Sequence, residues 1–236
     1  MKPYQPVVLD LLRSLQSGSV LDAPSGSGWL RQACAAEVAI DGLDLFAAEA
    51  GAHYRHFFQS DMNEGIPREC PMYDCIVSCE GLEHLHAPSV FLQAAKRHLR
   101  PGGLLIVSTP NVWYPGARLQ YLLRGFFPSF PCLVGRIAPG THMHVTPWSF
   151  PQLYLILRML GFHEITLHQS AWPAPKHAYE RILGFPQWLH CRWKERASDS
   201  EELTAFWRMA GSPASLYARG LVVSARVPEE ASVQLG

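Results

Sequence analysis

The sequence predicts one α/β domain built on a mainly parallel sheet, and three observations carry this prediction. A short apolar run ends at Asp22 and passes through a turn with two glycines into a helical pattern that opens at Trp29. A second apolar run, Tyr73 to Cys79, is short and rich in β-forming residues, as buried strands are. The 236 residues are 48% hydrophobic and 17% charged, which suits a single large domain with a full core.

The first half of the chain divides into strand–helix units. A helix over Tyr4–Leu15 is expected before the first strand, and a second strand ends at Asp44 in AIDGLDLF. A short third strand in FFQSDM precedes Asp61, and the fifth strand follows a Pro-Gly-Gly turn and runs through Thr109. We therefore expect five strand–helix units up to Thr109.

The second half is less regular. An insertion is expected at about 110–146, and a Trp- and Pro-rich segment with some helix at about 171–218, within a single domain of residues 1–236. Between them, apolar residues at core spacing predict a helix that Gly161 ends; they are Leu153, Ile156, Leu157 and Leu160. The sixth strand is expected in ITLHQ, and the last strand over Gly220–Val227.

Composition narrows the setting. No apolar run is long enough to span a membrane, and the start of the chain lacks the apolar region of a signal peptide. The six cysteines do not form zinc-like pairs, and Cys75 and Cys79 fall on one face of a strand, which favours buried thiols. These features predict a cytoplasmic protein, with contact at the inner face of the membrane as a further expectation.

The turn at 22–28 allows two kinds of ligand. Dinucleotide-binding proteins carry G-x-G-x-x-G, but Arg31 occupies the place of the third glycine. The turn resembles instead the first motif of class I S-adenosylmethionine (SAM)-dependent methyltransferases, an acidic residue followed by G-x-G-x-G. Asp22 is the acidic residue and Pro24 replaces the first glycine. HLRPGGLLIVSTPN is a second, more specific motif of that family, and the resemblance is close over 19–111 and looser over 141–226.

The resemblance implies a Rossmann-like seven-stranded sheet of order 3-2-1-4-5-7-6, with the last strand antiparallel and helices on both faces. It also implies SAM as the cofactor, with Asp44 accepting both ribose hydroxyls and Asp61 with Met62 contacting the adenine amino group. The expected cofactor-binding residues are Asp22, Ala23, Pro24, Ser25, Gly26, Gly28, Asp44, Leu45, Asp61, Met62, Cys79 and Glu80.

A second cluster, CEGLEHL, follows the fourth strand. Glu80 and Glu83 would share a face if this segment were helical, and THMHVTPW supplies His142 and His144 downstream. The pattern resembles two metal-using branches of the family, the small-RNA 2′-O-methyltransferases and the ubiquinone-pathway O-methyltransferases. That resemblance implies a divalent metal held by Glu80, Glu83, His84 and His144. The alternative is metal-free catalysis, in which Glu83 is structural and His84 or His144 is the general base. The expected catalytic residues are His84, His144 and Glu83.

Charge is uneven although its sum is zero. Residues 1–83 hold 12 acidic and 5 basic residues, whereas 84–163 hold no acidic residue. The basic residues of the second stretch are Lys96, Arg97, Arg100, Arg118, Arg124, Arg136 and Arg158. The acidic stretch carries the expected cofactor residues, and its negative charge suits the cationic sulfonium of SAM. The basic stretch is expected to carry the acceptor, and its charge suggests an anionic substrate or surface. Scattered, solvated arginines are the alternative interpretation.

The insertion bears on the acceptor. It carries Phe126, Phe127 and Phe130 beside an Arg-bearing helix, and it resembles the acceptor lid of methyltransferases of polysaccharide and cell-surface glycan synthesis. We therefore expect O-methylation of a saccharide hydroxyl, on a glycan that is anionic or lipid-linked, with peripheral membrane contact. The alternatives are a quinol- or phenol-type small-molecule O-methyltransferase and a non-catalytic SAM-binding subunit. An RNA acceptor is disfavoured by the zero net charge, no nucleic-acid partner is expected, and a dimer is left open.

Overall fold

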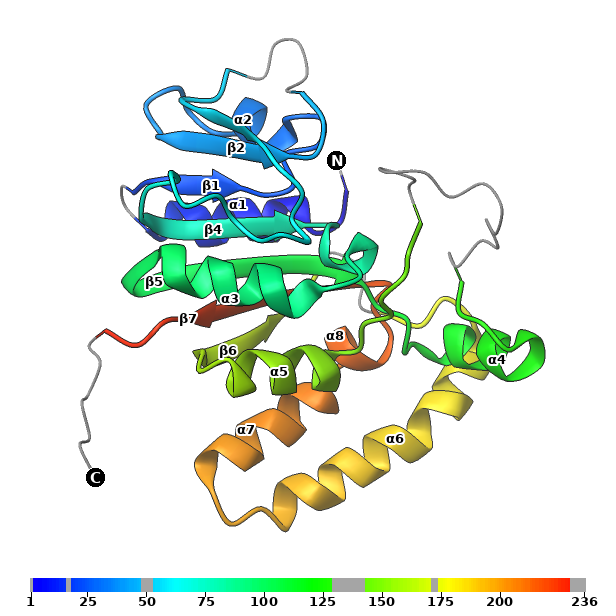
Figure 1. The fold of residues 1–236 in the computed structure, drawn as a ribbon. Coiled ribbons are helices and arrows are strands. Elements are labelled where there is room, and N and C mark those ends of the chain that lie inside the picture. The colour runs from blue at the N-terminus through cyan, green and yellow to red at the C-terminus, as the bar shows by residue number, and fades with distance from the viewer. Residues whose placement is uncertain (1, 16–17, 48–52, 129–142, 171–173, 230–236) are drawn as a thin grey trace.

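The computed structural model is organised by one seven-stranded sheet of order β3-β2-β1-β4-β5-β7-β6 (Figure 1). It describes residues 2–15, 18–47, 53–128, 143–170 and 174–229. The strands are β1 (Val20–Asp22), β2 (Ile40–Asp44), β3 (Phe57–Gln59), β4 (Tyr73–Cys79), β5 (Leu99–Pro110), β6 (His163–His168) and β7 (Gly220–Arg226). Strands β1 to β5 pair in parallel, and β7 runs antiparallel to both β5 and β6. The predicted fold, strand order included, is confirmed.

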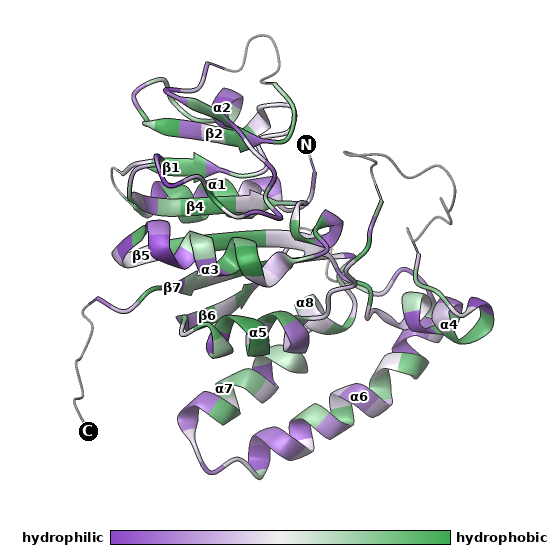
Figure 2. Ribbon diagram, in the orientation of Figure 1, coloured by the Kyte–Doolittle hydropathy of each residue, from purple (hydrophilic) through white to green (hydrophobic). Residues whose placement is uncertain are grey.

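Helices cover both faces of the sheet. They are α1 (Gln5–Arg13), α2 (Trp29–Ala33), α3 (Pro88–His98), α4 (Pro115–Arg124), α5 (Phe150–Met159), α6 (Ala178–Arg196), α7 (Glu201–Ala210) and α8 (Pro213–Leu216). Val8 of α1 and Leu30 of α2 pack with one set of strand residues, whereas Phe91 of α3 and Leu153 of α5 pack with the other set. Two apolar clusters therefore enclose the strands, whose residues are mostly hydrophobic in Figure 2.

Two of the expected strand–helix units show no helix in the part of the chain that the structure describes. Among the described residues, no helix joins β2 to β3 or β3 to β4. The second connection contains Pro67 and Pro71, and Gly65 adopts a positive φ of 101°, so this stretch cannot form a regular helix. The prediction of five units was wrong for this reason, and α2 and α3 are the helices that follow strands in this half.

The later helices follow their local sequence. Ser149 and Gln152 form a capping box at the start of α5, which ends before Gly161 at a φ of 78°. Within the expected insertion, α4 leaves Leu122 and Leu123 largely exposed, at 80% and 74%. In the Trp- and Pro-rich segment, α6 continues through Pro186. None of the described helices is long and apolar enough to cross a membrane.

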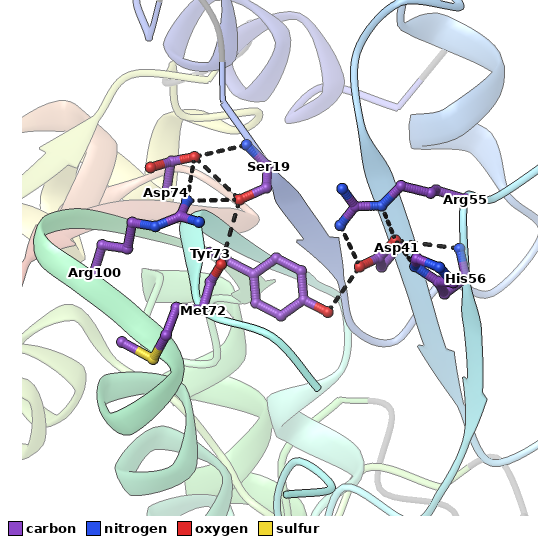
Figure 3. Close-up of polar contacts among 8 residues, drawn as sticks. All are labelled: Ser19, Asp41, Arg55, His56, Met72, Tyr73, Asp74 and Arg100. Carbon is purple, nitrogen blue, oxygen red and sulfur yellow. Dashed lines mark hydrogen bonds and ion pairs between the residues drawn. The ribbon is translucent and has the colours of Figure 1, made fainter. Parts of the chain in front are cut away.

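The amino-terminal edge of the sheet carries a dense polar network (Figure 3). Buried Asp41 accepts two hydrogen bonds from Arg55, at 2.9 and 2.8 Å, and one from the Tyr73 hydroxyl at 3.0 Å. Nearby, Asp74 accepts from the Ser19 backbone and from Arg100, each at 2.7 Å. These contacts tie β1, β2, β4 and β5 together at the edge opposite the glycine turn.

Candidate functional site

The turn between β1 and α2 places backbone groups at the carboxyl-terminal edge of the sheet. Ala23 and Ser25 continue the strand pairing, since the Ser25 N–H donates to the Leu43 carbonyl at 2.9 Å. Gly26 and Gly28 have positive φ of 50° and 70°, which glycine adopts without strain. A Cβ atom on Gly26 would meet no atom within 4 Å, so this part of the turn faces open space. A ligand can therefore reach the backbone here.

Pro24, which departs from the family motif, is accommodated by Gly81. The Ala23–Pro24 peptide bond is cis, and the proline ring lies against the turn that follows β4. A Cβ atom on Gly81 would lie 2.3 Å from the Cδ of Pro24, a distance that no side chain tolerates. The substitution in the first motif thus has a matching glycine in the second cluster, which the sequence pattern alone did not reveal.

Asp22 is fully buried at the end of β1. One of its oxygens, Oδ2, accepts a hydrogen bond from the Tyr54 hydroxyl at 2.7 Å, and the other has no partner among the described residues. Burial, with a smaller contribution from the charge of Asp44, raises the pKa of Asp22 well above its ordinary value. Tyr54 was not identified from the sequence, because it lies in an irregular connection with no motif around it.

The ends of β2 and β3 supply the other expected cofactor residues. The Asp44 carboxylate accepts from the backbone of Gly26 at 2.8 Å and of Phe46 at 3.1 Å, one bond to each oxygen. Each oxygen therefore keeps a lone pair for a further donor. Asp61 accepts two bonds from Asn63 on the single oxygen Oδ1.

The remaining expected cofactor residues differ in exposure. Leu45 and Asp61 are half-buried, whereas Met62 and Cys79 are buried, each at 6% exposed. The structure therefore brings the expected cofactor residues to one edge of the sheet, on β1, β2, β3 and β4 or directly after them.

The segment after β4 is a turn, not the helix considered above. Glu80 has a positive φ of 52°, and a single 3₁₀ turn spans Leu82–His84. Glu80 and Glu83 therefore do not share a helix face. The Glu80 carboxylate lies near the Ser108 hydroxyl at 3.4 Å, while Glu83 accepts from the Thr109 hydroxyl at 3.0 Å.

Glu83 is the most perturbed titratable group of this turn. Its side chain is buried, and Oε1 has no hydrogen-bond partner among the described residues. Burial, reinforced by the charge of Glu80, raises the pKa of Glu83 to about 8. Burial also raises the pKa of Glu80. Buried carboxyl groups of this kind are frequent at functional sites.

The His84 ring contacts the carbonyl of Met143, 59 positions further along the chain, and it also meets the ring of the next residue, His144. The Val145 and Thr146 N–H groups donate to the Glu83 carbonyl, which holds the later segment on the turn. The His84 and His144 rings are 4.9 Å apart, in an edge-to-face arrangement. Backbone contacts therefore place the two histidines together.

The tautomer of His84 follows from its contacts. Its Nδ1 lies 3.0 Å from the Met143 carbonyl, which only accepts, so Nδ1 carries the proton in the neutral ring. The lone pair is then on Nε2, 3.8 Å from Oε1 of Glu83. His84 thus presents a basic nitrogen to the buried end of Glu83.

The geometry supports three of the four expected metal ligands. Ligand atoms of Glu83, His84 and His144 all lie within 4.8 Å of one another, and Glu80 is not part of this group. Glu80, the fourth expected ligand, has a positive φ of 52° and lies outside this group, and its role as a ligand stays a prediction. His142 lies outside the described residues, as does Phe130.

The arginines of the acid-free stretch are largely structural. Arg100 binds Asp74, Arg118 donates to the Leu183 carbonyl, and Arg158 pairs with Glu202. Lys96 likewise donates to the Leu160 carbonyl at 2.7 Å. These four side chains therefore have partners within the protein, although Arg100 and Arg158 are also 48% and 40% exposed to solvent. Arg136 lies outside the described residues.

Comparisons with known proteins agree with this geometry. The model of the family described as "Methyltransferase domain" matches residues 2–166, and the chain belongs to that family. The sequence is 34% identical over 124 residues to the ubiquinone biosynthesis O-methyltransferase of Pseudomonas savastanoi pv. phaseolicola, covering 47% of this chain and 52% of that protein. The Pseudomonas fluorescens (strain Pf0-1) protein of the same name is 32% identical over 121 residues, with the same coverage. The chain thus spans about half the length of these curated relatives.

Solved structures show the same fold. A SAM-dependent methyltransferase from Archaeoglobus fulgidus superposes with a TM-score of 0.54 at 15% identity, covering 94% of this chain and 93% of that one. The Burkholderia thailandensis 1,6-didemethyltoxoflavin-N1-methyltransferase, solved with S-adenosylhomocysteine, gives a TM-score of 0.51 at 16% identity, covering 96% and 78%. At such identities the likeness establishes the fold of SAM-dependent methyltransferases, and the acceptor must be argued from the site.

Proposed function

We propose that the protein is a SAM-dependent O-methyltransferase that acts on a hydroxyl group of a small molecule. The observation that carries the proposal is the meeting of Glu83, His84 and His144 at the end of β4, beside a glycine turn with open space. The names of the curated relatives favour the quinol- or phenol-type acceptor over the saccharide expected first. A polysaccharide acceptor and membrane contact have no support among the relatives.

The cofactor would lie across the carboxyl-terminal ends of β1 and β2. The free lone pairs of Asp44 suit the two ribose hydroxyls, and Asp61 keeps its Oδ2 for the adenine amino group. The turn at Gly26 lets the methionine part approach the backbone. Asp22, which accepts a hydrogen bond from Tyr54, is buried at the end of β1, where the turn begins. Its second carboxyl oxygen has no partner among the described residues.

The reaction is an in-line displacement at the methyl carbon. A lone pair of the acceptor oxygen forms the new C–O bond, the C–S bond breaks with its electrons going to sulfur, and S-adenosylhomocysteine leaves. His84 Nε2 accepts the hydroxyl proton, because Nδ1 is held protonated by the Met143 carbonyl. Glu83, whose pKa of about 8 keeps it largely protonated near neutral pH, lies 3.8 Å from Nε2, and alignment of the two reacting atoms supplies much of the acceleration.

A divalent metal is the second candidate for this cluster. Glu83, His84 and His144 offer one carboxylate and two imidazoles within 4.8 Å, a donor set that suits Zn²⁺, Mn²⁺ or Fe²⁺ better than Mg²⁺. When bound, such an ion lowers the pKa of a coordinated hydroxyl. The partnerless Oε1 of Glu83 fits this use, since binding would replace the proton that burial retains.

Titration calorimetry with SAM and with S-adenosylhomocysteine, first in EDTA and then with added Mn²⁺ or Zn²⁺, tests the cofactor assignment. Micromolar binding is expected, and absence of binding of both nucleosides would overturn the proposal. Methyl transfer to catechol then tests the chemistry. His84→Ala should reduce kcat by about 100-fold, whereas His86→Ala, an exposed histidine two residues away, should leave it unchanged.

The same assays separate the remaining alternatives. Activity that persists in EDTA assigns His84 as the base without a metal, whereas activity restored by a stoichiometric ion that His144→Ala cannot bind assigns the metal site. Tight SAM binding with no transfer to any phenolic or saccharide hydroxyl would instead support the non-catalytic binding subunit. Transfer to saccharides alone would contradict the small-molecule acceptor.

A further inference from the structure

A cavity of about 500 Å³ adjoins the turn that carries Glu80. Its walls come from the first described residues of the chain, from the carboxyl-terminal edge of the sheet and from the segments that flank α6 and α8. The lining residues used below are Lys2, Tyr4, Glu80, Lys176, Tyr217 and Arg219. A volume of this size matches the pockets that hold small ligands.

Tyr4 links this cavity to the catalytic cluster. Its side chain is buried at 8% exposed, and its ring meets Trp29 edge-to-face. Burial raises the pKa of Tyr4, and the nearby Cys79 and Glu80 raise it further. Because Glu80 also lines the cavity, a molecule bound there would lie next to the turn that carries Glu83 and His84.

The lining has an excess of positive charge. Arg219 is already committed, since it pairs with buried Glu180 at 2.6 Å and lies 3.7 Å above the Tyr114 ring. Lys2 and Lys176 are exposed at the wall, and the carboxylate of Glu80 is the acidic group among the lining residues. The lining therefore contains two lysines outside the Arg219–Glu180 pair and one carboxylate, an excess of positive charge that favours an occupant with a negative charge.

The remaining lining residues of the cavity are mostly aromatic or apolar, and they suit a flat apolar ligand. Tyr4 and Tyr217 contribute aromatic rings, and Pro3, Pro110 and Pro175 contribute apolar surface without hydrogen-bond donors. An aromatic ring fits such walls, and its hydroxyl can point to Glu80 and the His84 turn. A saccharide, which needs many hydrogen-bond partners, fits them less well.

We propose that this cavity is the acceptor site and that it selects hydroxylated aromatic molecules bearing an anionic group, which Lys2 and Lys176 bind. The proposal rests on the O-methyltransferase function proposed above and names the class of its acceptor. Its test uses binding of unreactive probes, so that it does not depend on methyl transfer.

The experiment measures two dissociation constants on the full chain saturated with S-adenosylhomocysteine. The probes are 3,4-dimethoxybenzoate and the neutral 1,2-dimethoxybenzene, which differ only in the carboxylate. We expect the benzoate to bind about 10-fold more tightly at low salt, and the preference to fall at high salt. In the double variant Lys2→Gln/Lys176→Gln the preference should fall to about 1-fold, with binding of the neutral probe unchanged.

Lys194→Gln is the matched control. Lys194 is a lysine of α6 that lies 5.0 Å over the Trp193 ring and does not line the cavity, so its loss should leave the preference intact. Equal affinity for the two probes, or a preference that survives the double variant, would overturn the proposal. Because S-adenosylhomocysteine binding is measured first, failure of the cofactor assignment would be recognised separately from failure of acceptor selection.

Discussion

Asp41 and Asp22 are both fully buried at the sheet, but they lie at opposite edges and differ in their partners. Asp41, at the amino-terminal edge, is bound by Arg55, His56 and Tyr73 through both of its oxygens (Figure 3). Asp22, at the carboxyl-terminal edge, has Tyr54 on one oxygen and no partner on the other in the described structure. Buried polar groups are normally paired, so an unpaired one indicates a role in binding.

The pKa values differ in the same way. Burial alone would raise the pKa of Asp41, but the Arg55 hydrogen bonds and charge outweigh it and lower the value. At the other edge, burial raises the pKa of Asp22, Glu80 and Glu83, and the charge of Lys2, which lowers the values of Glu80 and Glu83, does not outweigh it. A buried carboxylate that is hydrogen-bonded on both oxygens, as Asp41 is, fits a structural role. A buried carboxylate with an oxygen that lacks a partner among the described residues fits a role in ligand binding.

Asp44→Ala should give the largest effect and should affect binding alone. The loss of two charged hydrogen bonds to the ribose is expected to weaken S-adenosylhomocysteine binding by at least about 100-fold. The free energy of unfolding should change by less than about 1 kcal/mol, because the freed Gly26 and Phe46 N–H groups are exposed to water. Calorimetry and denaturant titration measure the two quantities. Unchanged affinity would remove Asp44 from the cofactor site.

Asp41→Asn should have the opposite pattern. It removes the charge that Arg55 and Tyr73 bind, and the expected loss of unfolding free energy is about 3 kcal/mol, with cofactor affinity retained by the folded protein. Asp10→Asn is the control, since its pair with Arg13 has the same 2.8 Å distance but is more than 70% exposed on both sides. Equal effects of the two substitutions in denaturant titrations would contradict the assignment of Asp41 as a structural anchor.

Glu83→Gln should change the pH dependence of stability. The folded-state pKa of Glu83 is about 8, above its ordinary value, so from about pH 4.5 to about pH 8 the unfolded chain releases a proton that the folded chain keeps. Stability of the natural protein should therefore fall as pH rises through this window, by at least about 2 kcal/mol. The variant, neutral at residue 83 at every pH, should show a smaller fall in denaturant titrations at both ends of the window, because Asp22 and Glu80 still contribute to it. The same slope in both proteins would place a different group in this role.

The sequence predicted best what depends on neighbouring residues. Strand β4 was expected over Tyr73–Cys79 from its apolar run, and the structure has the same bounds. Leu153 and Leu157 are buried at the expected helical spacing, although Ile156 and Leu160 are partly exposed. Periodicity identifies such elements because their burial follows from local geometry.

Contacts between distant segments were harder to predict. The positive φ of Glu80 has no signal in CEGLEHL, and neither has the grouping of Glu83 with His84 and His144 without Glu80. The pairing of Pro24 with Gly81 and of Asp22 with Tyr54 depends on how separate turns meet. Spacing along the chain carries no information on such contacts, so they could not be derived from it.

Arg100→Met should give the smallest effect. It should show that having an ion-pair partner does not by itself determine how much a carboxylate contributes to the free energy of unfolding. Arg100 binds Asp74 at 2.7 Å at the same edge as Asp41, but the two side chains are 48% and 38% exposed. Water and salt screen such a pair, so the unfolding free energy should fall by less than about 1 kcal/mol, and less still at high salt.

Burial of Asp74 raises its pKa, and the Ser19 and Arg100 hydrogen bonds lower it to a net value below the ordinary one. The stability that Asp74 contributes should therefore be lost as pH falls below about 4, and this loss should shrink in the variant. A loss as large as that of Asp41→Asn would mean that position at the amino-terminal edge, and not burial, sets the contribution of a carboxylate.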